Sequence, residues 1–267
     1  MNKNKKDLHI LVTNDDGVYA PGLLALANAM RPLGRVSILA PERNWSAAGH
    51  QKTLNRPLRV KQVTLPDGTL AHASDGAPSD CVALAVLGFF DTRPDMVVSG
   101  INPTNNLGHD VTYSGTVTNA IEAAIWGLPG IALSLDAPNA KQGEVDYTPA
   151  AEVGRRVVEA VIRHGLPQDV ILSVNIPYLP LEQLEEFRIT RQGNRIYRDV
   201  LVKREDPWEK PYYWIGGEFP TGVPEDDTDV GAVAQGFVSI TPLQLDMTAY
   251  DHMDMLRQWN FDPDRQG

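Results

Sequence analysis

Short apolar runs alternate with helical patterns through the first 175 residues, and this alternation constrains the fold more than any other feature of the sequence. It is the signature of an α/β sheet with crossover helices. The predicted strands are His9–Asn14, Arg35–Ala40, Asp95–Ser99, Gly130–Ser134 and Val170–Val174. The predicted helices between them are Leu23–Arg31, Asp80–Phe90, Gly115–Trp126 and Thr148–Arg163. Strands that are apolar on both faces are typical of a buried, mostly parallel sheet.

The pattern changes after about residue 180, where the polar connections become long. Antiparallel strands or hairpin arms are predicted at Phe187–Gln192, Arg198–Lys203 and Tyr212–Gly216, followed by a strand at Gly236–Thr241 and a helix at Ala249–Trp259. We therefore predict an α/β fold with a Rossmann-like three-layer αβα sandwich over residues 1–180. A C-terminal extension over residues 181–267 is expected to add a β-hairpin arm and a terminal helix.

The amino-acid composition restricts which binding partners and which cellular compartment are expected for this chain. The chain has 24 Lys and Arg residues and 34 Asp and Glu residues, so its net charge is −10. This negative charge argues against a nucleic-acid duplex as a partner. A nucleotide is not excluded, because one bound cation can outweigh the surrounding field. The lone Cys81 excludes an internal disulfide and fits a reducing compartment. The apolar run after Lys3, Lys5 and Lys6 is too short for a signal peptide, and Cys81–Phe90 is about half a membrane span, so we expect a cytoplasmic protein without a membrane partner.

Polar clusters follow three of the predicted strands. They are Asn14–Gly17, Pro41–His50 and Gly100–Asp110. In an open parallel sheet, ligands bind in the crevice outside the carboxyl ends of the strands. Right-handed crossovers place the loops at these ends on one edge, so we expect the three clusters to converge.

The first cluster contains two adjacent carboxylates, Asp15 and Asp16. Such a pair repels at close range unless a cation or a proton intervenes. Carboxylates with a hydroxyl and an amide nearby suit a hard divalent ion such as magnesium or manganese better than zinc or copper. The alternative is a solvated turn with a helix cap, which the dipeptide alone favours. The position at a strand end, facing two further polar loops, favours the cation site.

The segment Tyr113–Val117 opens a predicted helix. It offers backbone donors, two hydroxyl groups and the positive end of a helix dipole, which together form a phosphate site. The alternative is a plain Ser or Thr N-cap, which is the more frequent role of such residues. His50 and His109 lie in the polar loops, where each is either a proton-transfer group or simply an exposed side chain.

Several common motifs are missing. The sequence has no Gly-x-Gly-x-x-Gly after the first strand, no Walker loop, no His-Glu-x-x-His and no Gly-x-Ser-x-Gly elbow. These absences weigh against a dinucleotide-binding domain, a P-loop enzyme, a zinc protease and a serine hydrolase.

Five stretches of the sequence together resemble the survival protein E (SurE) nucleotidase family. They are ILVTNDDGVYAPGL (10–23), APERNWSAAGH (40–50), DGAPSDCVALA (75–85), VSGINPTNNLGHDVTYSGTV (98–117) and GFVSITPLQLDMTAYD (236–251). They span most of the chain in the family's order and spacing. The combination is far more specific than any single stretch.

The resemblance implies a 5′-nucleotidase, a metal-dependent phosphatase that removes phosphate from nucleoside 5′- and 3′-monophosphates, with short polyphosphate as a substrate of some members. It implies one divalent ion per subunit, held by Asp15, Asp16, Ser46 and Asn102. It also implies a phosphate site lined by Asn106, Ser114, Gly115 and Thr116. The chain departs from the family at Thr104, where glycine is usual, and at Asn119, where a small residue is usual. Thr104 would reshape its loop if the position needs backbone angles that only glycine tolerates.

The expected mechanism is single-metal phosphomonoester hydrolysis, with Asp15 and Asp16 as the candidate catalytic residues. The cation neutralises phosphate oxygens and lowers the pKa of a bound water, while Ser114, Thr116 and the helix N-terminus stabilise the transferring phosphoryl group. Asp15 is either a ligand or the base that activates the water. Attack by an aspartate itself is less favoured, because carboxylates that bind one ion are poor free nucleophiles.

Two alternatives to an enzyme remain. The first is a non-enzymatic sensor that binds a nucleotide or phosphometabolite with the same residues and metal. The second is a structural Rossmann-like domain with an incidental acidic rim, which requires all three polar loops to coincide by chance.

Aromatic residues cluster in the extension. Residues 195–219 hold six of the 19 aromatics of the chain, namely Tyr197, Trp208, Tyr212, Tyr213, Trp214 and Phe219. A two-stranded ribbon is marginal alone and needs a surface to pack on, and clustered Tyr and Trp are typical of protein interfaces. The arm either folds back on its own subunit or contacts another. SurE proteins exchange such a segment between subunits, so the resemblance implies a homodimer or homotetramer.

Overall fold

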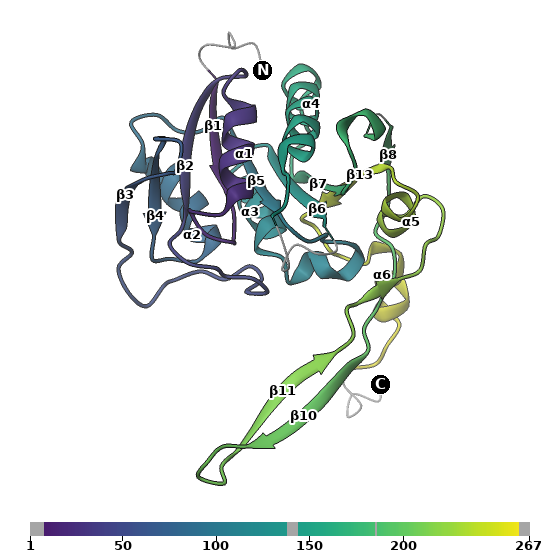
Figure 1. The fold of residues 1–267 in the computed structure, drawn as a ribbon. Coiled ribbons are helices and arrows are strands. Elements are labelled where there is room, and N and C mark those ends of the chain that lie inside the picture. Colours follow the sequence, from purple (N-terminus) through teal and green to yellow (C-terminus); the bar gives the residue numbers. More distant parts are fainter. Residues whose placement is uncertain (1–7, 138–143, 185, 262–267) are drawn as a thin grey trace.

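The computed structural model describes residues 8–137, 144–184 and 186–261, and Lys3, Lys5 and Lys6 lie outside them. Within this part of the chain, a nine-stranded sheet forms the centre of the molecule (Figure 1). In sheet order its strands are β3 (Val60–Thr64), β4 (Leu70–Ser74), β2 (Arg35–Pro41), β1 (His9–Thr13), β5 (Met96–Asn102), β6 (Gly130–Asp136), β7 (Val170–Pro177), β13 (Val238–Gln244) and β8 (Phe187–Ile189).

The strand order reverses at β1. Strands β4, β2, β1, β5, β6 and β7 run parallel, whereas β3, β13 and β8 run in the opposite direction. Ile10 in β1 pairs with Val36 in β2 on one side and with Met96 in β5 on the other. The chain therefore leaves β1 toward one edge of the sheet and later fills the opposite side. The carboxyl ends of β1 and β5 form the topological switch point, the position at which open α/β sheets bind ligands, and we call this region the crevice.

Helices cover both faces of the sheet and complete the three-layer sandwich (Figure 1). One face carries α1 (Pro21–Met30) and α4 (Thr148–His164), and the other carries α2 (Pro78–Leu84) and α3 (Gly115–Ile125). The first helix begins at Pro21, where a missing N–H removes no hydrogen bond, and it buries Leu23, Leu26 and Met30 at helical spacing. Strand β1 is buried along its whole length. The predicted fold class is confirmed.

Two regions differ from the sequence prediction. Strands β3 and β4 occupy a stretch for which no strand was predicted, because Val60–Thr64 is a largely exposed edge strand and lacks an apolar run. The helix predicted at Asp80–Phe90 begins at Pro78 and ends at Leu84. A wider turn, Ala85–Phe89, follows it and contains Gly88 with a φ of 109°. Cys81 is fully buried, and burial raises the pKa of its thiol.

One part of the C-terminal segment adds strands to the central sheet, and another part projects away from it. β8 and β13 add two strands beyond β7, and α5 (Asp229–Ala234) packs against β7 and β13. The hairpin β10 (Asp199–Glu205) and β11 (Pro211–Gly217) projects away from the sandwich (Figure 1). At its base β9 (Arg195–Ile196) pairs with β12 (Thr221–Gly222), and α6 (Tyr250–Arg257) follows β13.

Short 3₁₀ turns occupy Gly108–Thr112 and Leu181–Gln183. None of the helices in the described residues is long and apolar enough to cross a membrane.

Candidate active site

A tight turn at the end of β1 presents the two predicted carboxylates. Asn14 closes this turn, because its Nδ2 donates to the carbonyl oxygen of Gly17 at 3.0 Å and its Oδ1 accepts from the Gly17 N–H at 3.2 Å. Gly17 has a φ of 106°, a conformation that residues with a side chain resist. The turn is therefore fixed by its own sequence, and Asp15 and Asp16 stand in the crevice.

Asp15 lies against the N-terminus of α3. Its Oδ1 accepts a hydrogen bond of 2.5 Å from the Thr116 hydroxyl, and the carboxylate is almost completely buried. A Cβ on Gly115 would lie 2.5 Å from the Asp15 Cβ, so only glycine permits this approach. Burial raises the pKa of the Asp15 carboxyl, although hydrogen bonds from Thr116 and from the Gly115 backbone oppose the shift.

Asp16 has one oxygen that no described group satisfies. Its Oδ1 accepts a hydrogen bond of 3.3 Å from Asn44 Nδ2, whereas its Oδ2 is buried and has no hydrogen-bond donor among the described residues. Burial, and then the neighbouring Asp15 carboxylate, raise the pKa of Asp16 to about 7. A buried acceptor without a donor beside a second carboxylate is the environment that a cation stabilises.

The loop after β2 brings Ser46 to the same place. The Trp45 N–H donates to the Asp15 carbonyl oxygen at 2.8 Å, and the Ser46 N–H donates to Asn44 Oδ1 at 2.7 Å. Further along, the Gly49 N–H donates to the Tyr113 carbonyl oxygen at 3.0 Å, just before α3. Backbone contacts thus tie this loop to the end of β1 and to the start of α3, and Ser46 itself remains exposed.

Glu122 anchors the far part of this loop, and the sequence reasoning missed it. This buried carboxylate of α3 lies 2.5 Å from Lys52 Nζ and 2.9 Å from His50 Nε2, and it accepts a 2.7 Å hydrogen bond from Trp126 Nε1. Burial alone raises the pKa of Glu122, but the three hydrogen bonds outweigh it and lower the pKa. His50 is therefore bound in an anchor of the loop rather than free in the crevice. His109 is exposed.

A bulge at the end of β5 places Asn102. Ser99 pairs with Ala132 and Asn102 pairs with Ser134, so β5 carries one more residue than β6 between these pairs. The Asn102 Nδ2 donates to the Thr104 carbonyl oxygen at 2.6 Å and to the Thr104 hydroxyl at 3.1 Å. This leaves the amide oxygen of Asn102 as the atom suited to a cation. Thr104 has no positive φ, so threonine strains nothing at this position and instead orients Asn102.

Asn106 is held by two neighbouring strands. Its Nδ2 donates to the Ser134 hydroxyl of β6 at 2.7 Å. Its backbone N–H donates to Asn175 Oδ1 of β7 at 2.8 Å, and Asn175 Nδ2 returns a bond to the Asn106 carbonyl oxygen at 3.1 Å. Ser134 and Asn175 were not predicted, because serine and asparagine within apolar strands carry no motif of their own.

The start of α3 completes the crevice. Ser114 is the N-cap, and its hydroxyl accepts from the Val117 N–H at 3.1 Å, which is the alternative role that the sequence left open. The backbone at Gly115 and Thr116 faces Asp15. One helical turn further, Asn119 fills a fully buried position, where its Nδ2 donates to Ser99 Oγ at 3.1 Å.

The structure thus places the predicted residues in the turns and loops at the carboxyl ends of the parallel strands, and at the start of α3. Hydrogen bonds and close approaches link the segments of Asp15, Asp16, Ser46, Gly115 and Thr116, and β5 places Asn102 beside β1. No group of three or more His, Cys, Asp or Glu residues in the described ranges is arranged to hold a metal ion. A cation here relies on the mixed oxygen donors, and the unsatisfied Asp16 Oδ2 with the glycine-permitted approach of Asp15 fits one.

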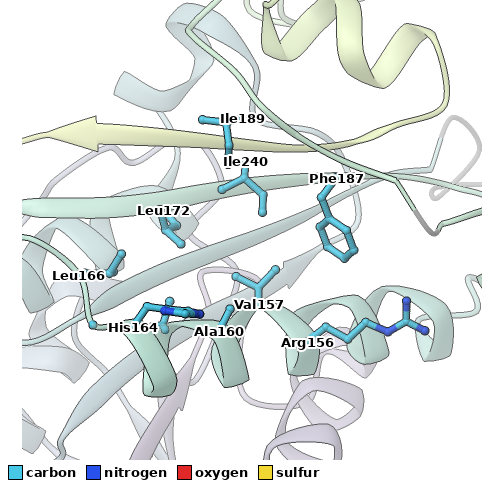
Figure 2. A pocket seen from close by; sticks show the side chains of 11 residues that line it. Arg156, Val157, Ala160, His164, Leu166, Leu172, Phe187, Ile189 and Ile240 are labelled. Atoms are coloured by element: carbon cyan, nitrogen blue, oxygen red, sulfur yellow. The ribbon is translucent and has the colours of Figure 1, made fainter.

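A separate apolar pocket of about 370 Å³ lies between α4 and the strands β7, β8 and β13 (Figure 2). Leu172, Phe187 and Ile240 line its interior, and Arg156 and His164 lie at its helical side. It does not include any of the residues of the crevice, and its lining does not suit a phosphate.

The fold and the side chains described above define an open-sheet α/β protein with a set of oxygen-bearing side chains where the strand order reverses. Within this class, the family model "Survival protein SurE" matches residues 10–199. The chain therefore belongs to the SurE family.

Close relatives cover nearly its full length. A protein called 5′-nucleotidase SurE from Herpetosiphon aurantiacus is 52% identical, covering 95% of this chain and 99% of the relative. A protein of the same name from Chloroflexus aggregans is 47% identical, covering 96% and 100%. The crystal structure of the SurE protein from Aquifex aeolicus superposes with a TM-score of 0.79 at 39% identity, covering 93% of this chain and 98% of that chain.

Proposed function

We propose that this protein is a metal-dependent phosphomonoesterase that hydrolyses nucleoside 5′-monophosphates to nucleoside and phosphate. The observation that carries the proposal is the convergence of Asp15, Asp16 and Asn102 at the switch point of a chain whose full-length relatives are named 5′-nucleotidases. Nucleoside 3′-monophosphates and short polyphosphate are further proposed substrates. No observation favours the non-enzymatic sensor.

We infer one divalent cation per subunit, magnesium or manganese, with Asp15, Asp16, Ser46 and Asn102 as its ligands. Hard oxygen donors support this choice. The buried Asp16 Oδ2 supports the site, because it lacks any other partner among the described residues. When bound, the cation offsets negative charge on the phosphate and lowers the pKa of the attacking water.

The chain's own residues orient the substrate and stabilise charge. In the proposed mechanism, the positive end of the α3 dipole, at Gly115 and Thr116, stabilises the growing negative charge on the phosphoryl oxygens. Asn106 and the Ser114 hydroxyl contact the same group. Asp15 orients the water or accepts its proton, and the Thr116 hydroxyl fixes the rotamer of Asp15 through its 2.5 Å bond.

A phosphate-release assay tests this function. The purified full chain is incubated with a panel of nucleoside 5′- and 3′-monophosphates, each with magnesium, manganese or zinc and each with EDTA. We expect release from 5′-monophosphates with magnesium or manganese and none with EDTA. Tight nucleotide binding without release in any combination would instead make the protein a sensor.

We further propose a homodimer or homotetramer held partly by the hairpin β10–β11. The arm projects from the sandwich (Figure 1). Leu201, Trp208, Trp214 and Ile215 on it are all exposed. This argues against the arm folding back on its own subunit. In the proposed division of labour, residues 1–180 bind metal and phosphate and residues 181–267 serve assembly. A cytoplasmic location is supported by the single, buried and unpaired Cys81.

A further inference from the structure

Asp229, the first residue of α5, is a buried carboxylate with no role in the chemistry described above. Only 1% of its surface is exposed. Its Oδ1 accepts hydrogen bonds from the N–H groups of Gly193 at 2.7 Å and Val230 at 2.8 Å. Its Oδ2 accepts from the Gly108 N–H at 2.7 Å. Bonds from backbone donors to a charged acceptor are stronger than neutral ones, so Asp229 firmly joins α5 to two segments that are remote in sequence.

Gly108 belongs to the loop of residues 103–112, which connects β5 to α3. The preceding residue, Leu107, is buried in a small cluster with Val230 of α5. Gly108 has a φ of 50°, and a Cβ there would lie 2.3 Å from the Gly193 carbonyl oxygen. The loop and the C-terminal segment therefore meet backbone to backbone, at a point that Asp229 bridges.

Neighbouring side chains of the C-terminal segment hold the same loop. Gln192 Nε2 donates to the Gly108 carbonyl oxygen at 2.9 Å. Arg195 Nε lies 2.8 Å from Asp110 Oδ2, and the Tyr197 hydroxyl donates to Asp110 Oδ1 at 2.6 Å. Every one of these groups comes from the base of the hairpin arm or from the residues just before it.

We propose that Asp229 is a positioning residue for the phosphate site, which it serves by fixing the loop that carries Asn106. The inference rests on the proposed function, in which Asn106 contacts the phosphate. Asn106 is held on one side by Ser134 and Asn175, and Asp229 holds the chain two residues later. Among the described residues, no hydrogen bond joins the C-terminal segment to the side chains of Asp15 or Asp16. A displaced loop therefore weakens phosphate binding before it weakens metal binding.

The test uses Asp229→Asn in the full chain, because an amide cannot accept from both Gly108 and Gly193 with the same strength. We expect the KM for AMP and the Kd for inorganic phosphate to rise about tenfold, while kcat falls less and the Kd for manganese stays within about twofold. Loss of binding that the ground state and the transition state share has this signature. Asp226→Asn, on the exposed turn before α5, is the matched control and should change nothing.

Gln192→Leu removes one surface hydrogen bond to the same loop, and it decides the question if Asp229→Asn does not fold. It should raise the KM for AMP about threefold. Hydrogen exchange over residues 103–112 should be faster in both variants than in the control. Unchanged exchange and phosphate affinity would overturn the inference, as would a parallel loss of manganese affinity. If the wild type releases no phosphate from AMP, the proposed function is wrong. The hydrogen-exchange rates and the Kd for inorganic phosphate still test the role of Asp229 in that case.

Discussion

The crevice at the end of β1 and the hairpin arm differ in how their side chains are satisfied. In the crevice, Asp15 and Asn106 are buried, and each has partners from other segments of the same chain. On the arm, Trp214 is 64% exposed and Ile215 is 82% exposed, so the described part of their own subunit leaves most of both side chains uncovered. Asp15 and Asn106 already have polar partners within the chain, and Asp16 Oδ2 is left for a cation, whereas the apolar side chains of the arm lack apolar partners. We therefore expect changes in the crevice to act on catalysis and changes in the arm to act on assembly.

The largest effect is expected from Asp16→Asn. The variant keeps the shape of the side chain but removes the charge at the buried, unpartnered oxygen. Turnover of AMP should fall by at least about 10²-fold, the scale of losing a key electrostatic group. Manganese affinity, measured by calorimetry, should fall as well. Asp91→Asn, an exposed carboxylate, is the control. Full activity of Asp16→Asn in EDTA would contradict the metal site.

Gly115→Ala should have the next largest effect. The added Cβ would lie 2.5 Å from the Asp15 Cβ, so Asp15 or the start of α3 must move. We expect activity to fall about tenfold or more, because a small misplacement of a catalytic group costs this much. Gly216→Ala in the arm is a matched control, since its added Cβ meets only Val202 Cγ2 at 3.7 Å and a backbone oxygen at 3.9 Å. Equal activities of the two variants would show that the close approach of Asp15 is unimportant.

Glu122→Gln tests the anchor of the loop that carries Ser46. The substitution removes the negative charge and one of the two oxygens that accept the three hydrogen bonds, so the free energy of unfolding should fall by about 1–3 kcal/mol at pH 7, as measured by urea denaturation. Since the folded state lowers the pKa of Glu122, its contribution is complete above the unfolded pKa, about 4.3, and is lost as the pH falls through the folded pKa. The difference between variant and wild type should therefore shrink at acidic pH. Glu42→Gln, on the surface, should change stability little at either pH.

The arm should give the smallest effect on activity and stability. Trp208→Ala combined with Trp214→Ala removes two side chains that are exposed in the single subunit, so the unfolding free energy of that subunit should change by less than about 0.5 kcal/mol per site. Phosphate release per subunit should stay near the wild-type value, while light scattering shows smaller particles. A wild-type particle of one 29.3 kDa chain at micromolar concentration would refute the proposed assembly.

Local patterns explain why much of the molecule could be predicted. The apolar run His9–Thr13 followed by Asn14-Asp15-Asp16-Gly17 identifies a buried strand with acidic residues at its end, and the structure has both. The same logic found α3 and its N-terminal segment. Strand β3 was not predicted from the sequence, because an exposed edge strand needs no alternation of apolar and polar residues.

The supporting groups of the site could not be predicted in this way. Asp229 and Gly108 are 121 residues apart, and Glu122 and Lys52 are 70 apart. A carboxylate in α5 or α3 carries no local sign of the partner that it meets across such distances. Only the folded arrangement shows that these residues hold the loops on which the recognisable motifs stand.

The place of β1 in the sheet has a consequence for the synthesis of the chain. Its carboxylates are among the first residues made, but β5, its neighbour in the sheet, is complete only when residue 102 has left the ribosome. Strand pairs this distant in sequence make folding slow, because the intervening chain must first be ordered. Until then β1 can pair only with β2, and its other apolar edge has no partner strand. A nascent chain therefore exposes an unpaired apolar strand edge, which favours aggregation, while the proposed metal ligands Asp15 and Asp16 are already present.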